Sequence, residues 1–188
     1  AFSKVRRSSD NDYLVANKIT QFLENYVEEL DLKYDIHEKR AKVIKQLYDS
    51  TPSIRPAYGR IMSRYGWRRH PVTGKRRFHK GIDIAAKIGS TIHVTADGVI
   101  EYAGWSRSFG YVVVVDHSYG FRTIYAHCFQ VLVEKNENVS KGQVIALVGS
   151  TGLSTGPHLH YEIRKFRKAK NPIAFLDLDL FTAQRRMW

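Results

Sequence analysis

The sequence predicts a mainly β protein, a small antiparallel sandwich or open barrel, preceded by a long α-helical segment. Apolar residues recur at three- and four-residue steps over residues 12–50, which is a helical period. Beyond residue 83 the chain becomes a series of short apolar runs separated by turns, as in antiparallel sheets. With 188 residues and 43% hydrophobic content, the chain suffices for one domain plus an appended segment.

The N-terminal segment opens with residues 1–10, which are polar and which we expect to fray. The helical period then runs from Asp12 to Thr51-Pro52, because proline disfavours helix in the residue before it. The period weakens over residues 31–37, so two helices are an alternative to one. Two interpretations remain open: the segment packs on its own domain, or it is the end of a coiled coil that links the domain to an anchored protein or a partner.

We expect three parts in the chain: the helical segment over residues 1–50, the β domain over 51–175 and a tail over 176–188. The β domain is expected to begin with a linker that contains proline and glycine, residues 51–65. A turn-rich basic loop follows at residues 68–77.

The remaining β domain alternates between apolar runs and turn residues. The expected strands are residues 92–96, 99–103, 111–116, 121–128 and 143–148. The four consecutive valines in the third of these runs indicate a strand that is buried on both faces.

The net charge of +12 implies an anionic partner, such as a nucleic acid, a membrane surface or an acidic polymer. The basic residues cluster at 68–77 and 164–170. The single cysteine, Cys128, excludes an internal disulfide and a cysteine-ligated zinc knuckle. No run of 18 apolar residues predicts a membrane span. The sequence starts at Ala1 without a signal peptide, so we expect any signal or membrane anchor only in residues outside it.

A polar row marks the predicted strand at residues 157–163. In an alternating strand, His158, His160 and Glu162 share one face, and apolar residues fill the other. Such a histidine pair alone is more often structural or exposed than metal-binding.

Residues 78–84 supply partners for this row. There His79, Gly81 and Asp83 share one strand face, and the glycine leaves room for something close to the backbone. Together, His79, Asp83 and His160 give two imidazoles and a carboxylate with a fourth position open. A catalytic rather than a structural zinc site is built in this way.

The motifs are similar to those of the LytM/lysostaphin-type zinc endopeptidases, peptidase family M23, which cut peptidoglycan peptides. The likeness rests on the His-x-Gly-x-Asp motif at 79–83, on Tyr125-Ala126-His127 and on His158-Leu159-His160, and it extends from about Tyr58 to Pro172.

The resemblance implies one Zn²⁺ per chain, bound by His79, Asp83 and His160, with His127 and His158 as catalytic acid–base groups. The implied partner is peptidoglycan, an anionic cell-wall polymer that the basic residues would attract. We therefore expect an exported protein of the periplasm or cell envelope. The helical segment is a candidate for self-association or for binding a protein partner.

In the alternating run of residues 124–128, His127 falls on the face of Tyr125, whereas Ile124, Ala126 and Cys128 point the other way. We expect Cys128 to be a small buried apolar residue rather than a nucleophile. Alone, His127 would be a structural histidine, so its catalytic role comes from the resemblance.

Other residues carry weaker signals. Glu162 lies beyond the ligand, so we expect it to support the ligand or to be a buried polar residue. Four further histidines have no paired ligand and are expected to lack a catalytic role: His37, His70, His93 and His117. Relatives often carry asparagine facing substrate where this chain has Tyr111.

The sequence leaves three alternative functions. Some relatives have lost the ligands and act as non-hydrolytic or partner-controlled regulators of other wall hydrolases, although here all five residues are present. Residues 97–100 and 139–145 resemble a lipoyl-type carrier domain, but the carrier lysine is missing. Nucleic-acid binding rests on charge alone, without a recognised motif, so we expect none.

Overall fold

The computed structural model describes residues 2–69 and 74–176, with side chains from Asn17 onward. The chain divides into two compact units, Ala1–Gln46 and Leu47–Trp188.

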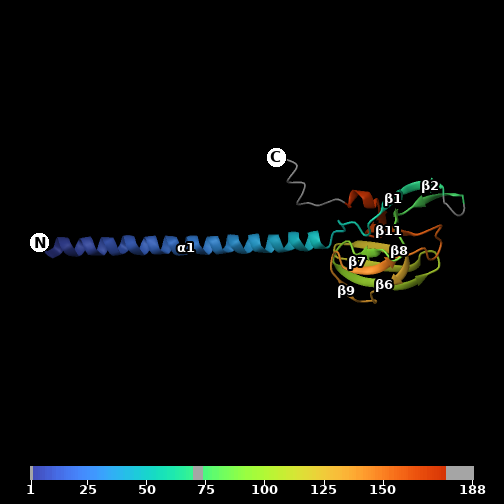
Figure 1. The fold of residues 1–188 in the computed structure, drawn as a ribbon. Helices are drawn as coiled ribbons and strands as arrows, with labels where there is room; N and C mark the ends of the chain where they lie inside the picture. The colour runs from blue at the N-terminus through green and yellow to red at the C-terminus, as the bar shows by residue number, and fades with distance from the viewer. Residues whose placement is uncertain (1, 70–73, 177–188) are drawn as a thin grey trace. The chain divides into compact units, whose positions relative to one another are not determined.

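The N-terminal unit lies within one continuous helix, α1 (Phe2–Asp49; Figure 1). The expected fraying of residues 1–10 and the alternative of a break at 31–37 are therefore wrong for the described residues. Neither stretch contains glycine or proline, and Lys33 forms an i,i+4 ion pair with Glu29 in the preceding turn (2.7 Å). The helix ends as expected, where the Thr51 hydroxyl donates to the carbonyl of Leu47.

Apolar side chains of α1 are exposed to solvent. Examples that expose between 45% and 68% of their surface are Ile19, Phe22, Leu23, Tyr26 and Leu30. This amphipathic helix fits both interpretations of the segment, and its partner stays a prediction. No helix in the described part of the chain has the length and hydropathy of a bilayer span.

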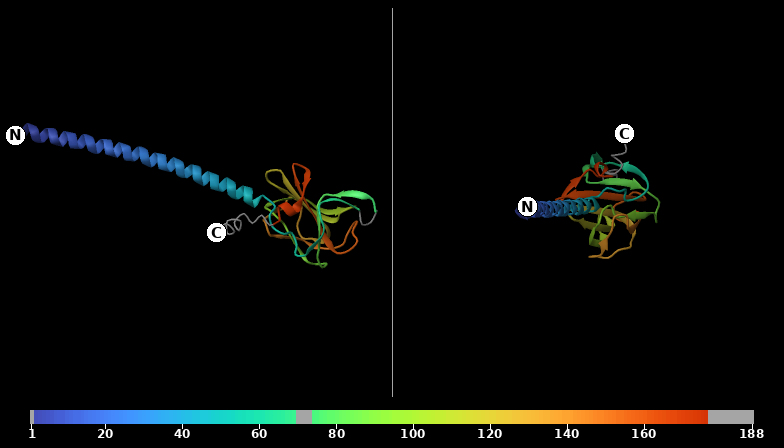
Figure 2. Two further views of the ribbon diagram at one scale, coloured as in Figure 1. Left: turned by 90° about the horizontal axis from the view of Figure 1, so that it is seen from above. Right: turned by 90° about the vertical axis from the view of Figure 1, so that its left-hand side faces the viewer.

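The C-terminal unit is an antiparallel β structure, which confirms the predicted fold class (Figures 1 and 2). Its main sheet follows the order β1-β4-β11-β8-β7-β6-β9, with β10 pairing β5 and β8, and β12 pairing β11. A separate two-stranded ribbon pairs β2 with β3. The bounds are β1 Arg60–Ser63, β2 Gly66–Arg69, β3 Arg76–His79, β4 Ile82–Ala85, β5 Thr91–His93, β6 Gly98–Ser106, β7 Gly110–His117, β8 Phe121–Val131, β9 Asn138–Val139, β10 Val144–Val148, β11 His158–Lys165 and β12 Lys168–Lys170.

The strands curve around one apolar core (Figure 2). The predicted inward rows of β4 and β11 are correct, since Ile82, Ile84, Leu159 and Tyr161 are all 2% exposed or less and belong to this core. The valine run of β7 is buried on both faces, as expected, because its members contribute both to the main core and to a smaller apolar cluster behind the sheet. This second cluster lies on the sheet face that carries the polar row of β11.

The segment 51–65 differs from the expected linker. It contains β1, and Ala57 is 2% exposed within the core. Its backbone also bonds to the sheet, since the amide of His93 in β5 donates to the carbonyl of Pro56 at 2.7 Å. Local composition favours a linker here, but the polar backbone groups are satisfied by distant strands.

Residues 78–84 do not form one strand. The chain leaves the ribbon at the end of β3 and enters the main sheet as β4, with Gly81 at the crossing. At Gly81 an added Cβ would lie 2.2 Å from the carbonyl oxygen of Tyr161. The room expected beside this glycine is therefore filled by the backbone of β11. In the C-terminal part, the structure describes a short 3₁₀ helix, η1 (Pro172–Ala174), while residues 177–188 lie outside the described residues.

Candidate active site

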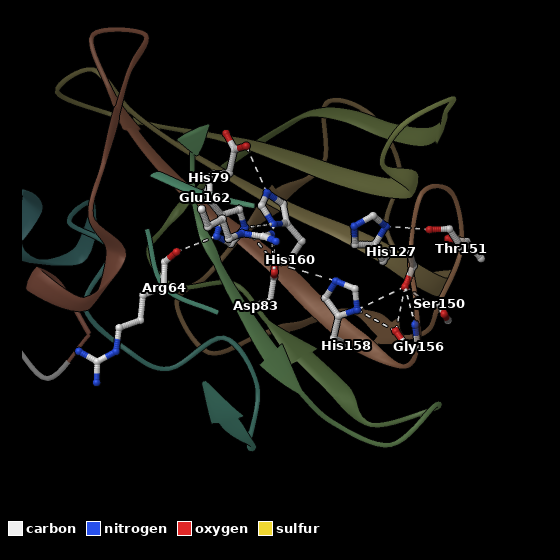
Figure 3. Close-up of polar contacts among 12 residues, drawn as sticks. Arg64, His79, Asp83, His127, Ser150, Thr151, Gly156, His158, His160 and Glu162 are labelled. Carbon is white, nitrogen blue, oxygen red and sulfur yellow. Dashed lines mark hydrogen bonds and ion pairs between the residues drawn. The ribbon is translucent and has the colours of Figure 1, made fainter. Parts of the chain in front are cut away.

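Three buried side chains converge from three strands (Figure 3). His79 ends β3, Asp83 belongs to β4 and His160 to β11, where Asp83 and His160 are register partners. The Nε2 atom of His79 lies 3.1 Å from both Oδ1 of Asp83 and Nδ1 of His160. The Nδ1 atom of His160 lies 2.8 Å from the same carboxylate oxygen.

Hydrogen bonds on the outer side set the tautomers of both imidazoles. Nδ1 of His79 donates to the carbonyl oxygen of Arg64 at 2.9 Å, because a carbonyl can only accept. Nε2 of His160 lies 3.2 Å from a carboxylate oxygen of Glu162 and donates to it. The inward nitrogens, Nε2 of His79 and Nδ1 of His160, are therefore left with lone pairs directed at Asp83.

Three electron-pair donors at this spacing could hold a metal ion between them. Their separations approach the edge of about 3.3 Å expected for a tetrahedron with metal–ligand bonds of about 2.0–2.1 Å. Two imidazole nitrogens and one carboxylate oxygen suit Zn²⁺ and leave one position open. These residues fit the predicted ion, and all three ligand atoms lie within 4.8 Å of one another.

Both carboxylates of the site are paired with an arginine. Nη2 of Arg68 donates to Oδ2 of Asp83 at 3.0 Å, which leaves Oδ1 facing the two imidazoles. Arg164 donates to Oε2 of Glu162 through Nε and Nη2, at 2.9 and 2.6 Å. The arginines offset the negative charge of the carboxylates, so a bound cation would keep most of its electrophilic character.

Hydrogen bonds between Asp83 and His160 shift the pKa values of both side chains. Burial alone would raise the pKa of Asp83, but hydrogen bonds with His160 and His79 hold it well below its usual range. Burial alone would lower the pKa of His160, but hydrogen bonds with Asp83 and Glu162 outweigh this and raise it. A metal must therefore displace a proton from His160 at low pH.

A bulge in β8 positions His127. Between the register pairs Val113↔Tyr125 and Tyr111↔Cys128, β8 advances three residues while β7 advances two. The extra residue falls at His127, whose φ of 63° is in the left-handed region that few non-glycine residues adopt. The bulge turns the His127 ring toward the site, 6.0 Å from the ring of His160.

This bulge overturns the strict alternation expected in residues 124–128. Cys128 lies with Tyr125 in the main core, whereas Ile124 and Ala126 belong to the smaller cluster on the other face. The prediction of an inert buried cysteine still holds, because burial raises the pKa of the Cys128 thiol to about 12.

His127 and His158 form a pair beside the three converging groups, with ring centroids 4.8 Å apart. Nδ1 of His127 donates to the carbonyl of Thr151, and Nδ1 of His158 donates to that of Gly156, both at 2.7 Å (Figure 3). Both Nε2 atoms are thus left as proton acceptors on the site side.

The protonation state of His127 follows from its surroundings. Burial lowers the pKa of His127 to about 4, so the ring is neutral near pH 7. For His158, the Nε2 atom lies 3.9 Å from Oδ1 of Asp83, which places it next to the converging donors. The Nε2 atoms of His127 and His158 thus lie beside the three converging donors.

A comparison with known protein families adds independent evidence. The sequence profile described as "Peptidase family M23" matches residues 77–172, about half of the chain, and these residues contain all five site residues. The chain belongs to peptidase family M23.

Curated relatives and solved structures are similar to part of this chain. Over 117 residues, 62% of this chain, it is 44% identical to the DD-carboxypeptidase/endopeptidase Mpg of Neisseria meningitidis, of which it spans only 27%. A zinc-containing peptidase of Vibrio cholerae has a TM-score of 0.58 at 36% identity, covering 65% of this chain and 38% of that one. The catalytic domain of lysostaphin from Staphylococcus simulans gives 0.57 at 30% identity, covering 62% and 91%.

The M23 fold brings all five predicted site residues together, although their individual roles stay a prediction. Of the other histidines, His37 is exposed on α1, His93 bonds to Thr91, and His117 is buried in a polar network of the core. His70 lies outside the described residues. Tyr111 is 42% exposed and packs edge-on against Trp105.

Sequence reasoning missed several supporting groups. Arg68 and Arg164 were expected to attract polymer but bind buried carboxylates instead. Phe109 stacks on the ring of His160, with centroids 5.8 Å apart, and was not singled out. The sequence offered one usable signal, since Arg164 stands four residues after His160 and shares the alternating face of the same strand.

Proposed function

We propose that this chain is a zinc-dependent endopeptidase that hydrolyses peptide bonds in peptidoglycan stem peptides or cross-links. The observation that carries the proposal is the convergence of three lone-pair donors, from His79, Asp83 and His160, next to two further imidazoles with inward-facing acceptor nitrogens. A structural metal site would have a fourth protein ligand and no need of such bases.

When bound, Zn²⁺ would supply Lewis-acid chemistry, acidifying a water from a pKa of about 15.7 towards about 7 and polarising a carbonyl. The chain's own residues would handle the protons. Nε2 of His127, which is neutral near pH 7, or Nε2 of His158 accepts a proton from the attacking water. The resulting imidazolium then donates this proton to the leaving amine, while the Thr151 and Gly156 carbonyls keep the rings in orientation.

The names of the relatives support the choice of substrate. The Neisseria relative is a DD-carboxypeptidase/endopeptidase, and a relative in Vibrio cholerae is named peptidoglycan DD-endopeptidase ShyC. Peptidoglycan also suits the net charge of +12, since it is an anionic polymer. We accordingly propose action in the periplasm or cell envelope, for remodelling of the wall.

The test combines metal analysis with product analysis. The parent protein loaded with Zn²⁺ is expected to contain one ion per chain and to release fragments from purified wall peptides, identified by mass. The His160→Ala and Asp83→Ala variants should lose the metal and the activity while keeping the fold, judged by circular dichroism. Full zinc occupancy in both variants would refute the ligand assignment.

The same experiment addresses the alternative of a non-hydrolytic or partner-controlled regulator. Such a protein would bind zinc stoichiometrically yet release no fragments from wall peptides. Fragments that appear only after a second protein is added would identify partner control.

A further inference from the structure

The β2–β3 ribbon places two arginines on the face that carries a proposed metal ligand. In its register, Gly66 pairs with His79 and Arg68 pairs with Arg77. Since strand residues alternate, Arg77 lies on the same face as His79, two positions along β3. The Arg68 side chain confirms the direction of this face, because its guanidinium reaches Asp83.

Two directly opposed arginines are unfavourable in a two-stranded ribbon. The Cβ atoms of such a pair lie about 4.5–5.5 Å apart, and like charges at this spacing repel. Of the two arginines, only Arg68 pairs with a carboxylate, that of Asp83. Among the described residues no carboxylate pairs with Arg77, which is exposed. The pair therefore keeps an unbalanced positive charge beside the site.

On the opposite face of the same ribbon, the arginine packs against an aromatic ring. There the guanidinium of Arg76 lies over the ring of Trp67, 5.3 Å from its centroid. The neighbouring Trp67 and Phe78 rings pack edge to face at 5.5 Å. On the site-facing side, by contrast, Nε of Arg68 is buried without a hydrogen-bond partner in the described part of the chain. The positive charge that no described carboxylate balances, that of Arg77, therefore lies on the ribbon face that carries His79.

We propose that Arg77 forms a subsite for a carboxylate of the substrate, adjacent to the scissile peptide bond. Two positions along a strand span about 7 Å, and a peptide residue spans at most about 3.6 Å. The recognised carboxylate therefore belongs within about two residues of the bond that is cut. This inference rests on the proposed peptidase function and makes Arg77 a specificity-determining residue.

The subsite is tested with two synthetic stem-peptide dimers that differ only in the carboxyl group nearest the scissile bond. This group is a free carboxylate in one dimer and a primary carboxamide in the other. Dissociation constants are measured for the zinc-loaded protein by fluorescence anisotropy, alongside kcat and KM. We expect the parent to bind the carboxylate form about five- to tenfold more tightly, with little difference in kcat.

The variants assign this preference to one side chain. Arg77→Gln should bring the affinity ratio close to one, and Arg77→Lys should keep part of it, with zinc content unchanged in both. Arg69→Gln is the matched control, because Arg69 is an exposed arginine of the same ribbon on its other face. It should keep the parent ratio.

Two outcomes would overturn the inference: a parent that binds both peptides equally, or a ratio that survives in Arg77→Gln. Because the ratio is read from binding, it is obtained even for a protein that cleaves neither peptide. That result would refute the proposed peptidase activity instead. Cleavage of both peptides with equal affinities would refute the subsite alone.

Discussion

Gly81→Ala is the substitution for which the structure sets the clearest expectation. The new Cβ would lie 2.2 Å from the Tyr161 carbonyl oxygen, whereas an ordinary contact needs at least 3.4 Å, so the strands must separate by about 1.2 Å. Next to this contact, strands β4 and β11 pair Ile82 with Tyr161 and then Asp83 with His160. Asp83 and His160 are two of the proposed ligands. The strain therefore acts directly on the distance between Asp83 and His160.

The expected size follows from this displacement. Overpacking of a filled site typically costs about 1–3 kcal/mol of the free energy of unfolding. Metal sites tolerate distance errors of only about 0.2 Å, so we expect zinc affinity to fall at least about tenfold. Misplacement of reacting groups by about 1 Å costs about 10²-fold in rate. Chemical denaturation, zinc competition titration and wall-peptide hydrolysis measure these three quantities.

Gly156→Ala is the matched control for stability and zinc affinity. No atom lies within 4 Å of a Cβ at this position, and its φ is outside the left-handed region. Its free energy of unfolding should stay at the parent value or rise by about 0.4–1 kcal/mol. A Gly81→Ala protein with parent stability and parent zinc affinity would show that this close contact does not set the spacing of the ligands.

Three further predictions concern catalysis, pH and charge. His127→Ala and His158→Ala should each keep zinc but lose about 10²–10⁴-fold in hydrolysis, and a parent rate in either would remove that residue from the mechanism. Burial lowers the pKa of His117, so the folded chain binds this proton less readily than the unfolded chain, whose pKa is about 6.5. The free energy of unfolding should therefore fall as pH drops below about 6.5, by up to about 1.4 kcal/mol per pH unit, and this part of the slope should vanish in His117→Gln. Binding to intact sacculi should weaken steeply between 0.1 M and 1 M salt, because the Debye length shortens from about 10 Å to about 3 Å. Hydrolysis of a small soluble peptide should change less over the same range. Equal salt sensitivity of sacculus binding and peptide hydrolysis would mean that the positive charge does not recruit polymer.

The sequence by itself determined the class of the fold and the donor set of the site. Alternation is a local property, so it correctly assigned the core-facing row of β11 and the polar row that carries His158 and His160. The motif spacing identified His79, Asp83 and His160 as a group, because the chemistry of metal ligands leaves few residue types to choose from. The helix was also readable, though its start and its continuity were not.

Tertiary structure decided what local patterns cannot encode. The sheet change between His79 and Asp83 depends on the close approach of the β11 backbone at Gly81. Alternation would have turned His127 into the core, and only the mismatch between β7 and β8 creates the bulge that turns it out. Likewise, a basic run looks uniform in sequence, yet Arg68 binds Asp83 while its cross-strand partner Arg77 has no carboxylate partner among the described residues. Each of these depends on contacts between residues far apart in the chain, whose pairing is set when the whole core packs.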